Sequence, residues 1–378
     1  MNSALDTIIA AGDDERRDLF TGAAGRLGTA VQNVEKDFWV CWILDVLFNR
    51  LPDDRPRLLF KGGTSLSKAF GLITRFSEDI DVTVFREDLG TAATVDELEA
   101  LSGKKQRARL TAIKAARLAY IAGSLLDDLS RLSASAMKES KVAGDRWRLE
   151  LDKDDPDQQT LLFWYPAVTA PLGDYIRSAI KIESGAKSAL DPHVAAEVKP
   201  YVADDLDNLD LTVKGVTTVE AARTFWDKIT ILHGLRRWYD KRGTLRHGEQ
   251  RVSRHYYDVD RLLASPIADP TLDDADLGLD CARHARMFFN SSDLDLAHAA
   301  PGSFTIAPSK EMIDPLRRDT GRWQAWCSAA SRTSTPCWST SQSNSSPRDS
   351  LRPMAIASAP TALTITVRQA LDLLYDIT

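Results

Sequence analysis

Two short segments in the first quarter of the chain constrain its fold more than any other feature. In "LLFKGGTSLSKAF" an apolar run ends at the glycine pair Gly62-Gly63, and in "DIDVTVF" the aspartates Asp79 and Asp81 stand two residues apart. The first segment predicts a buried strand, a tight turn and a short helix. The second predicts a strand, and because residues i and i+2 of a strand project to one face, we expect the two carboxylates side by side.

This pairing of motifs predicts a particular chemistry. Adjacent carboxylates on an apolar strand repel each other and resist burial. A divalent cation relieves both costs, and Mg²⁺ (or Mn²⁺) prefers carboxylates combined with substrate phosphates. A glycine turn at a helix start can hold phosphate through its backbone N–H groups. The two motifs together favour group transfer from a nucleoside triphosphate over the alternative of a plain turn and a surface strand.

The rest of the chain mixes strands and helices up to about residue 215, after which helices dominate to about residue 300. Apolar residues at steps of four from Val34 to Val46 predict a helix with one buried face. Thr64 or Ser65 suits the N-cap of the helix after the glycine pair, and Thr218 suits the start of a later one. Other helices are expected over 13–30, 64–73, 95–140, 217–240, 253–265 and 275–300, and other strands over 146–153, over 160–168 and ending near Glu183.

Composition excludes some classes of protein. The net charge of -6 and the pI of about 5.6 argue against a general coat on nucleic acid, although a local basic face remains compatible with RNA binding. The four cysteines form no C-x-x-C pair, which indicates neither a disulfide framework nor a zinc site. Neither a signal peptide nor an apolar run long enough to span a membrane is recognisable, so we expect a cytoplasmic protein.

Several motifs together resemble a known family. "FKGGTSLSKAF" and "RFSEDIDV" are similar to the AbiEii/AbiGii group of toxins from abortive-infection and toxin–antitoxin systems, within the nucleotidyltransferase superfamily related to DNA polymerase beta. "VEKDFWV", "IKIESGAK", "FWDKITILHGL" and "SRHYYDVDRLL" follow the same group's order, over about residues 30–320. The resemblance implies an α/β (α+β) nucleotidyltransferase fold with a mixed sheet over 1–215, followed by an α-helical domain over 216–320.

The resemblance also implies roles for residues around the two opening motifs. Asp79 and Asp81 match the aspartates that hold metal. The residues matched to binding of nucleotide phosphate are Lys61, Gly62, Gly63, Thr64, Ser65 and Ser77.

Three residues further along the chain complete the implied catalytic site. Lys228 matches a lysine that reaches the triphosphate, although by itself it reads as a solvated cation on a helix. Asp258 matches the aspartate of the R-H-Y-Y-D motif, or else it pairs with Arg254 or Arg261. Glu183 is the candidate for the third carboxylate that the superfamily usually carries, as general base or second metal ligand. Its alternative is an exposed glutamate at a strand end.

The reaction implied by the resemblance is transfer of a nucleoside monophosphate from an NTP to an acceptor hydroxyl, with release of pyrophosphate. The group's relatives point to RNA, including the tRNA 3′ end, as the acceptor, and to a cognate antitoxin protein as the partner. Two alternatives stay open. One is nucleotidylation or phosphorylation of a protein, and the other is a catalytically inactive regulator that binds nucleotide.

The segment 236–254 carries seven Lys or Arg and only two acidic residues. It is either a solvated connection between helices or a surface that attracts RNA or triphosphate. His233 and His255 are expected to pack or to form hydrogen bonds. The neighbouring aromatic residues that would stack a base are Trp238, Tyr239, Tyr256 and Tyr257.

The composition changes abruptly after Asp319. From Cys327 to Ser350, nine of twenty-four residues are serine, and the tryptophans nearby follow no helical or strand period. A GC-rich gene that is read out of frame gives such a composition. We therefore predict a frameshift near codon 320, an atypical tail over 321–378, and disorder or poor packing over 321–362.

Overall fold

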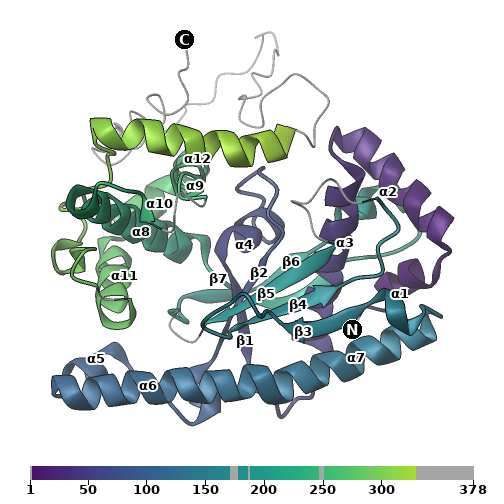
Figure 1. Cartoon of the computed structure of the whole chain (residues 1–378), viewed down its shortest axis with the longest axis horizontal. Helices are drawn as coiled ribbons and strands as arrows, with labels where there is room; N and C mark the ends of the chain where they lie inside the picture. The colour runs from purple at the N-terminus through teal and green to yellow at the C-terminus, as the bar shows by residue number, and fades with distance from the viewer. Residues whose placement is uncertain (1, 171–177, 186–187, 247–250, 290, 329–378) are drawn as a thin grey trace, which may run out of the picture.

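A seven-stranded sheet lies at the centre of the molecule (Figure 1). The computed structural model describes residues 2–170, 178–185, 188–246, 251–289 and 291–328. The strands are β1 (Leu58–Lys61), β2 (Ile80–Val84), β3 (Arg148–Leu151), β4 (Thr160–Trp164), β5 (Ala179–Gly185), β6 (His193–Val198) and β7 (Val213–Val219), in the order β3-β4-β5-β2-β1-β7-β6. Since β1 pairs in parallel with β7 and β2 with β5, while the other pairs are antiparallel, the predicted mixed sheet is confirmed.

Helices surround this sheet in three groups. In Figure 1, α1 to α3 lie at the right, α6 and α7 run along the bottom, and α8 to α11 gather at the left. Their bounds are α1 (Ser3–Ala10), α2 (Asp13–Leu27), α3 (Val31–Asp45), α4 (Gly62–Lys68), α5 (Val95–Glu99), α6 (Gly103–Tyr120), α7 (Leu126–Glu139), α8 (Ala221–Arg242), α9 (Arg254–Leu263), α10 (Ala268–Asp273), α11 (Ala275–Phe288) and α12 (Lys310–Ser328).

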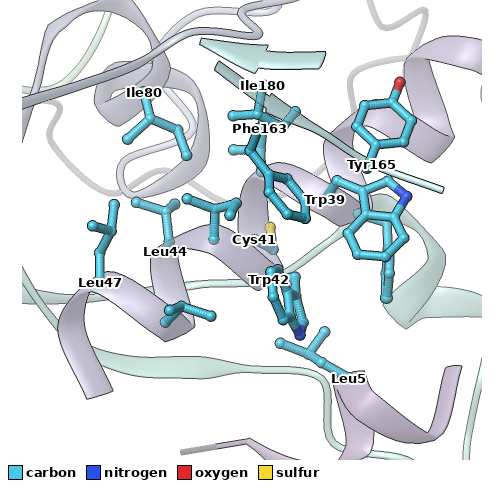
Figure 2. Packing of buried hydrophobic residues seen from close by; sticks show 14 of the residues in the cluster. Leu5, Trp39, Cys41, Trp42, Leu44, Leu47, Ile80, Phe163, Tyr165 and Ile180 are labelled. Atoms are coloured by element: carbon cyan, nitrogen blue, oxygen red, sulfur yellow. The ribbon is translucent and has the colours of Figure 1, made fainter. Parts of the chain in front are cut away.

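Aromatic packing between α3 and the sheet forms the larger core (Figure 2). Trp39 stacks on Tyr165 with ring centroids 5.6 Å apart, and Trp42 stacks on Phe163 at 5.4 Å. The apolar face predicted at steps of four from Val34 to Val46 is buried, as expected. This packing fixes β4 and β5, and β5 in turn supports β2, which carries Asp81. Asp79, which was expected in the same strand, lies immediately before it.

A second core joins α8, α9 and α12. Its buried members include Leu66, Ile73, Phe225 and Tyr256. The first two belong to the segment between the glycine pair and the aspartates, so this segment packs against the helical part. The predicted domain boundary at residue 215 falls inside β7, and we propose that it lies after Val219 instead.

Some expected element boundaries are wrong. Thr218 lies in β7, where pairing with β1 and β6 extends the strand, and α8 begins at Ala221. Thr64 and Ser65 lie inside α4, which has Lys61 as its N-cap. Strands β6 and β7 have no counterpart among the expected elements. The first three residues of the edge strand β6 are all exposed, so it lacks the alternation by which a strand is recognised.

The predicted tail coincides only partly with the described residues. Helix α12 continues to Ser328, so residues 321–328, for which the change in composition predicts disorder, are helical. The remainder of the predicted tail, from residue 329 onwards, lies outside the described residues.

Candidate active site

The glycine turn and the aspartate strand meet at the end of β1. In the antiparallel pairing of β1 with β2, Lys61 lies opposite Asp81. In the parallel pairing of β2 with β5, Asp81 lies opposite Glu183. Sheet register thus brings together two carboxylates that are about a hundred residues apart in the sequence, beside the glycine turn.

Close contacts require both glycines. Gly62 has a φ of +81°, in the left-handed region, and a Cβ at this position would lie 2.1 Å from Oδ2 of Asp81. A Cβ on Gly63 would lie 2.4 Å from Nη2 of Arg75. The absence of side chains therefore lets the turn approach a carboxylate on one side and a guanidinium on the other.

Two buried hydroxyls hold this turn in place. Thr64 donates a hydrogen bond to the carbonyl of Asp79, and its Oγ1 lies 2.8 Å from Oγ of Ser77. The hydroxyl of Ser65 donates to the carbonyl of Gly62 at 2.9 Å. Because these two hydroxyls have partners within the protein, we propose that they position the turn rather than contact nucleotide.

Negative charge accumulates beside the turn. Burial raises the pKa of Asp79 to about 6, and repulsion by Glu78 and Glu183 adds to this effect. The Glu183 carboxylate is half exposed and lies 2.6 Å from Nζ of Lys181. Within the described ranges, no three His, Cys, Asp or Glu side chains already form a metal cage. A divalent cation on Asp79 and Asp81 would neutralise this charge, with substrate phosphate and water oxygens as further ligands, so the donor set fits Mg²⁺ or Mn²⁺.

A buried group of three charged side chains lies behind the turn. Arg75 makes a bidentate ion pair with Asp258, with Nε–Oδ1 and Nη2–Oδ2 distances of 2.7 Å. Nζ of Lys228 lies 2.8 Å from Oδ2 of the same carboxylate. Burial alone would raise the pKa of Asp258, but the two cations outweigh it and hold this pKa well below its usual range. We call these three residues the ion triad.

The ion triad settles two of the sequence-based alternatives. Lys228 is buried and paired, so it is not a solvated cation. Asp258 does not pair within its own helix as proposed, because its partners are Arg75 and Lys228, and Arg261 pairs with Asp260.

One cavity of about 740 Å³ connects these groups. The predicted site residues that line it are Lys61, Gly62, Gly63, Ser77, Asp79, Asp81, Glu183 and Lys228. Thr64, Ser65 and Asp258 are not among the lining residues, and they support the wall from behind. The structure thus brings most of the predicted site together around one space.

Four arginines also line the cavity. Arg246, Arg251 and Arg254 belong to the basic segment 236–254, whereas Arg75 lies just before the aspartate pair. The guanidinium of Arg251 lies 3.9 Å from Oδ2 of Asp79, and its backbone N–H donates to Asp319 of α12 at 2.6 Å. Arg75 stands between the two opening motifs, in "TRFSED". Arg75 begins the motif "RFSEDIDV", but its pairing with Asp258 could not be predicted, because the two residues lie far apart in the sequence.

The aromatic stacking surface expected around 238–257 is wrong for its three tyrosines. Tyr239, Tyr256 and Tyr257 are buried, and their hydroxyls bond to Glu311 O, Ile306 O and Thr74 Oγ1 respectively. Trp238 is half-buried beneath the guanidinium groups of Arg242 and Arg246.

The two histidines of this region differ from each other. His233 is buried, and its Nδ1 accepts a hydrogen bond from the Thr305 N–H, in agreement with the expected packing role. His255 lines the cavity. Burial lowers its pKa well below the usual value, and Lys228 and Arg254 add to that effect.

Comparisons with known proteins identify a family and a similar solved structure. A family model described as "Nucleotidyl transferase AbiEii toxin, Type IV TA system" matches residues 45–342, which extends past the predicted frameshift near codon 320. Among solved structures, the chain is similar to MenT4, the nucleotidyltransferase toxin Rv2826c of Mycobacterium tuberculosis H37Rv, at 15% identity and a TM-score of 0.42 over 96% of this chain and 90% of that one. No curated protein matches. No helix in the described part of the chain is long and apolar enough to cross a bilayer.

Proposed function

We propose, from the premise that this chain belongs to the AbiEii family of nucleotidyltransferase toxins, that it transfers a nucleoside monophosphate from an NTP to an RNA hydroxyl. One observation supports this most directly: the register that sets Asp81 opposite Lys61 and Glu183 also brings the Gly62 turn against the Asp81 carboxylate. A metal-binding carboxylate and a phosphate-binding turn therefore share one space. Such a toxin belongs to a toxin–antitoxin system, so an antitoxin is its partner.

The bound metal would be held by Asp79 and Asp81. When bound, Mg²⁺ or Mn²⁺ supplies charge neutralisation at the phosphate oxygens of the NTP. The backbone N–H groups at Gly62 and Gly63 would hold the phosphates from the other side, with Lys61 and Ser77 nearby. Thr64 and Ser65 would keep this turn at its distance from the aspartates.

The transfer itself needs a nucleophile, a base and a leaving group. The acceptor oxygen forms a bond to the α-phosphorus while the bond from that phosphorus to the pyrophosphate oxygen breaks. Glu183 lies on the strand next to Asp81 and is half exposed, so we assign it the acceptor proton. Lys228, oriented by Asp258, would stabilise the negative charge that develops on the leaving pyrophosphate.

Labelling of cellular RNA tests the proposal. The full chain is incubated with total RNA, Mg²⁺ and each NTP in turn, labelled either at the α- or at the γ-phosphate. We expect α-label in RNA and an added nucleotide at sequenced 3′ ends, with the tRNA fraction as the first to examine. Label in protein would support the competing modification of a protein target. Transfer of γ-label would indicate a kinase, and no transfer at all would indicate a regulator that binds nucleotide only.

A further inference from the structure

Three consecutive charged residues of α3 are buried, namely Glu35, Lys36 and Asp37, and each is at most 4% exposed. Charged side chains are almost never buried to this extent unless they are paired. Successive side chains of a helix point about 100° apart, so each of the three reaches a different segment of the chain. Glu35 accepts hydrogen bonds from the backbone N–H groups of Val168 and Thr169, which do not line the cavity. The proposed transfer reaction uses none of the three side chains.

The other two residues of this run hold segments that form the active site. Asp37 accepts a hydrogen bond from Nζ of Lys68 at 2.6 Å, and Lys68 lies in α4, the helix that begins with the glycine turn. Lys36 makes an ion pair with Glu78, whose side chain is only 9% exposed. Glu78 directly precedes Asp79 in the sequence. Two adjacent residues of α3 therefore hold the two opening motifs of the site, one each.

Two contacts fix the chain around Asp79. Its carbonyl accepts a hydrogen bond from the Thr64 hydroxyl, and the side chain before it, Glu78, is held against α3 by Lys36. The guanidinium of Arg251 is beyond hydrogen-bond distance of Glu78, since its Nη2 lies 3.7 Å from Oε1. Because Glu78 is itself a carboxylate, without Lys36 it would be free to turn towards a cation bound at Asp79 and to disturb the ligand geometry there.

We propose that Lys36 is a positioning residue for the metal-binding carboxylate of Asp79, and that it acts through its ion pair with Glu78. The inference rests on the proposed function, because it assumes a divalent cation on Asp79 and Asp81. Lys36 does not line the cavity, so a contact with the substrate does not explain its burial. Side chains that support metal ligands from behind change metal affinity when they are replaced, and this is the property that the proposal assigns to Lys36.

Direct binding of Mn²⁺ to the full chain tests the proposal without any measurement of activity. The free ion is followed by electron paramagnetic resonance, in the absence of NTP. The test variant combines Lys36→Met with Glu78→Gln, which removes the ion pair, leaves no uncompensated buried charge and keeps the net charge of the protein unchanged. We expect Mn²⁺ binding to weaken by about tenfold, as for the loss of a side chain that supports a metal ligand.

The matched control is a second buried ion pair, at the C-terminal end of α3. Nε of Arg50 lies 2.7 Å from Oδ2 of Asp45, the two side chains are 7% and 1% exposed, and neither residue lines the cavity. Arg50→Met combined with Asp45→Asn therefore removes a comparable pair away from the site. Both double variants should have a lowered melting temperature, but the control should bind Mn²⁺ as the wild type does. If the control loses as much Mn²⁺ affinity as the test variant, the effect comes from general destabilisation and the proposal is overturned.

The single variant Lys36→Met separates positioning from charge. It removes a positive charge near the site, so charge alone would leave Mn²⁺ binding unchanged or make it tighter. Loss of positioning makes Mn²⁺ binding weaker instead, and this is the result that we expect. Unchanged or tighter binding in this variant would contradict the proposal.

Asp81→Asn distinguishes a failure of this inference from a failure of the proposed function. If Asp81→Asn binds Mn²⁺ more weakly than the wild type but the Lys36→Met/Glu78→Gln variant does not, the positioning role is overturned while the metal site stands. If Asp81→Asn binds Mn²⁺ as the wild type does, the proposed metal site fails, and the role of Lys36 fails with it.

Discussion

The carboxylate of Asp81 faces both the glycine turn and Glu183, so its charge is exposed to whatever the cavity binds. Asp81→Asn removes that charge with little change in volume and lowers the repulsion among the neighbouring acids. We expect transfer to be abolished while the free energy of unfolding stays the same or rises slightly. Turnover close to that of the wild type, measured with α-labelled NTP, would remove Asp81 from the proposed metal site.

Two members of the ion triad, Lys228 and Arg75, line the cavity. Lys228→Ala should lower kcat/KM by roughly 10²-fold, as for the loss of one charge-stabilising donor. Lys241→Ala is the matched control, since Lys241 is an exposed lysine of the same helix outside the cavity. Equal rates for the two variants would assign Lys228 to folding alone.

Asp258 makes stability depend on pH in a defined direction. The pKa of Asp258 is lowered in the folded state. Its contribution to stability is therefore complete above the unfolded pKa of about 3.9, and it is lost as the pH falls from there towards the lower folded pKa. Asp258→Asn leaves Arg75 and Lys228 buried without their carboxylate, which should cost about 3–5 kcal/mol at pH 7.

The contribution of Asp258 is measured by urea unfolding of the wild type and of Asp258→Asn between pH 7 and pH 3. The difference in free energy of unfolding should be constant above about pH 5 and should narrow below about pH 4. A difference that grows as the pH falls would contradict the lowered pKa of Asp258 in the ion triad.

Most of the site residues predicted from the sequence line one cavity in the structure, but their interaction partners were not predicted. Asp79, Asp81 and Gly62 were identified from spacing, because strand alternation and turn chemistry are local properties. The ion pair of Arg75 with Asp258 was missed, because the two residues are 183 positions apart and only the fold brings them together. The alternative partners expected for Asp258, Arg254 and Arg261, are therefore wrong.

The turn between β1 and α4 depends on glycine for two separate reasons. Gly62→Ala combines the strain of a positive φ with a Cβ 2.1 Å from Asp81, so it should displace that carboxylate and reduce transfer about as strongly as Asp81→Asn. Gly71→Ala separates the two effects, because Gly71 has a φ of +63° and nothing within 4 Å of an added Cβ. We expect Gly71→Ala to cost about 1 kcal/mol of stability with transfer retained. Similar loss of transfer in both variants would show that strain alone is responsible.

The helices and strands could also be predicted only where the signal lies in neighbouring residues of the sequence. Helix α3 was predicted because its apolar residues recur at steps of four. Strands β6 and β7 were missed because their pairing, rather than an alternating pattern, makes them strands. The residues 217–219 read as a helix start, and pairing with β1 and β6 decided otherwise.

Helix α12 supports the rest of the molecule through Asp319, a residue that precedes the predicted tail. Asp319 accepts hydrogen bonds from the backbone N–H groups of Arg251 and Ser253 and from the Ser253 hydroxyl, at 2.6–2.7 Å. It thereby holds the loop that carries Arg251 to the cavity. The last residue before the change in composition is thus part of the support of the site.

A chain that ends after residue 320 keeps Asp319 and all proposed site residues. We expect it to bind NTP with an affinity close to that of the full chain, although the loss of residues 321–328 of α12 should lower its melting temperature. The same truncated chain with Asp319→Ala should bind NTP more weakly, because the Arg251 loop loses its acceptors. NTP binding by the full chain, the truncated chain and the truncated Asp319→Ala variant is measured by calorimetry. Resequencing of the gene tests the predicted frameshift. Loss of binding in the simple truncation would show that residues beyond 320 contribute to the site.

The ion triad also limits how relatives of this protein can diverge. Arg75, Lys228 and Asp258 come from distant parts of the chain and share one buried carboxylate. Replacement of Asp258 alone leaves two buried cations without their shared carboxylate, so that single substitution is expected to be eliminated by selection. Across an alignment of homologues, Asp258 should therefore change only together with Arg75 and Lys228.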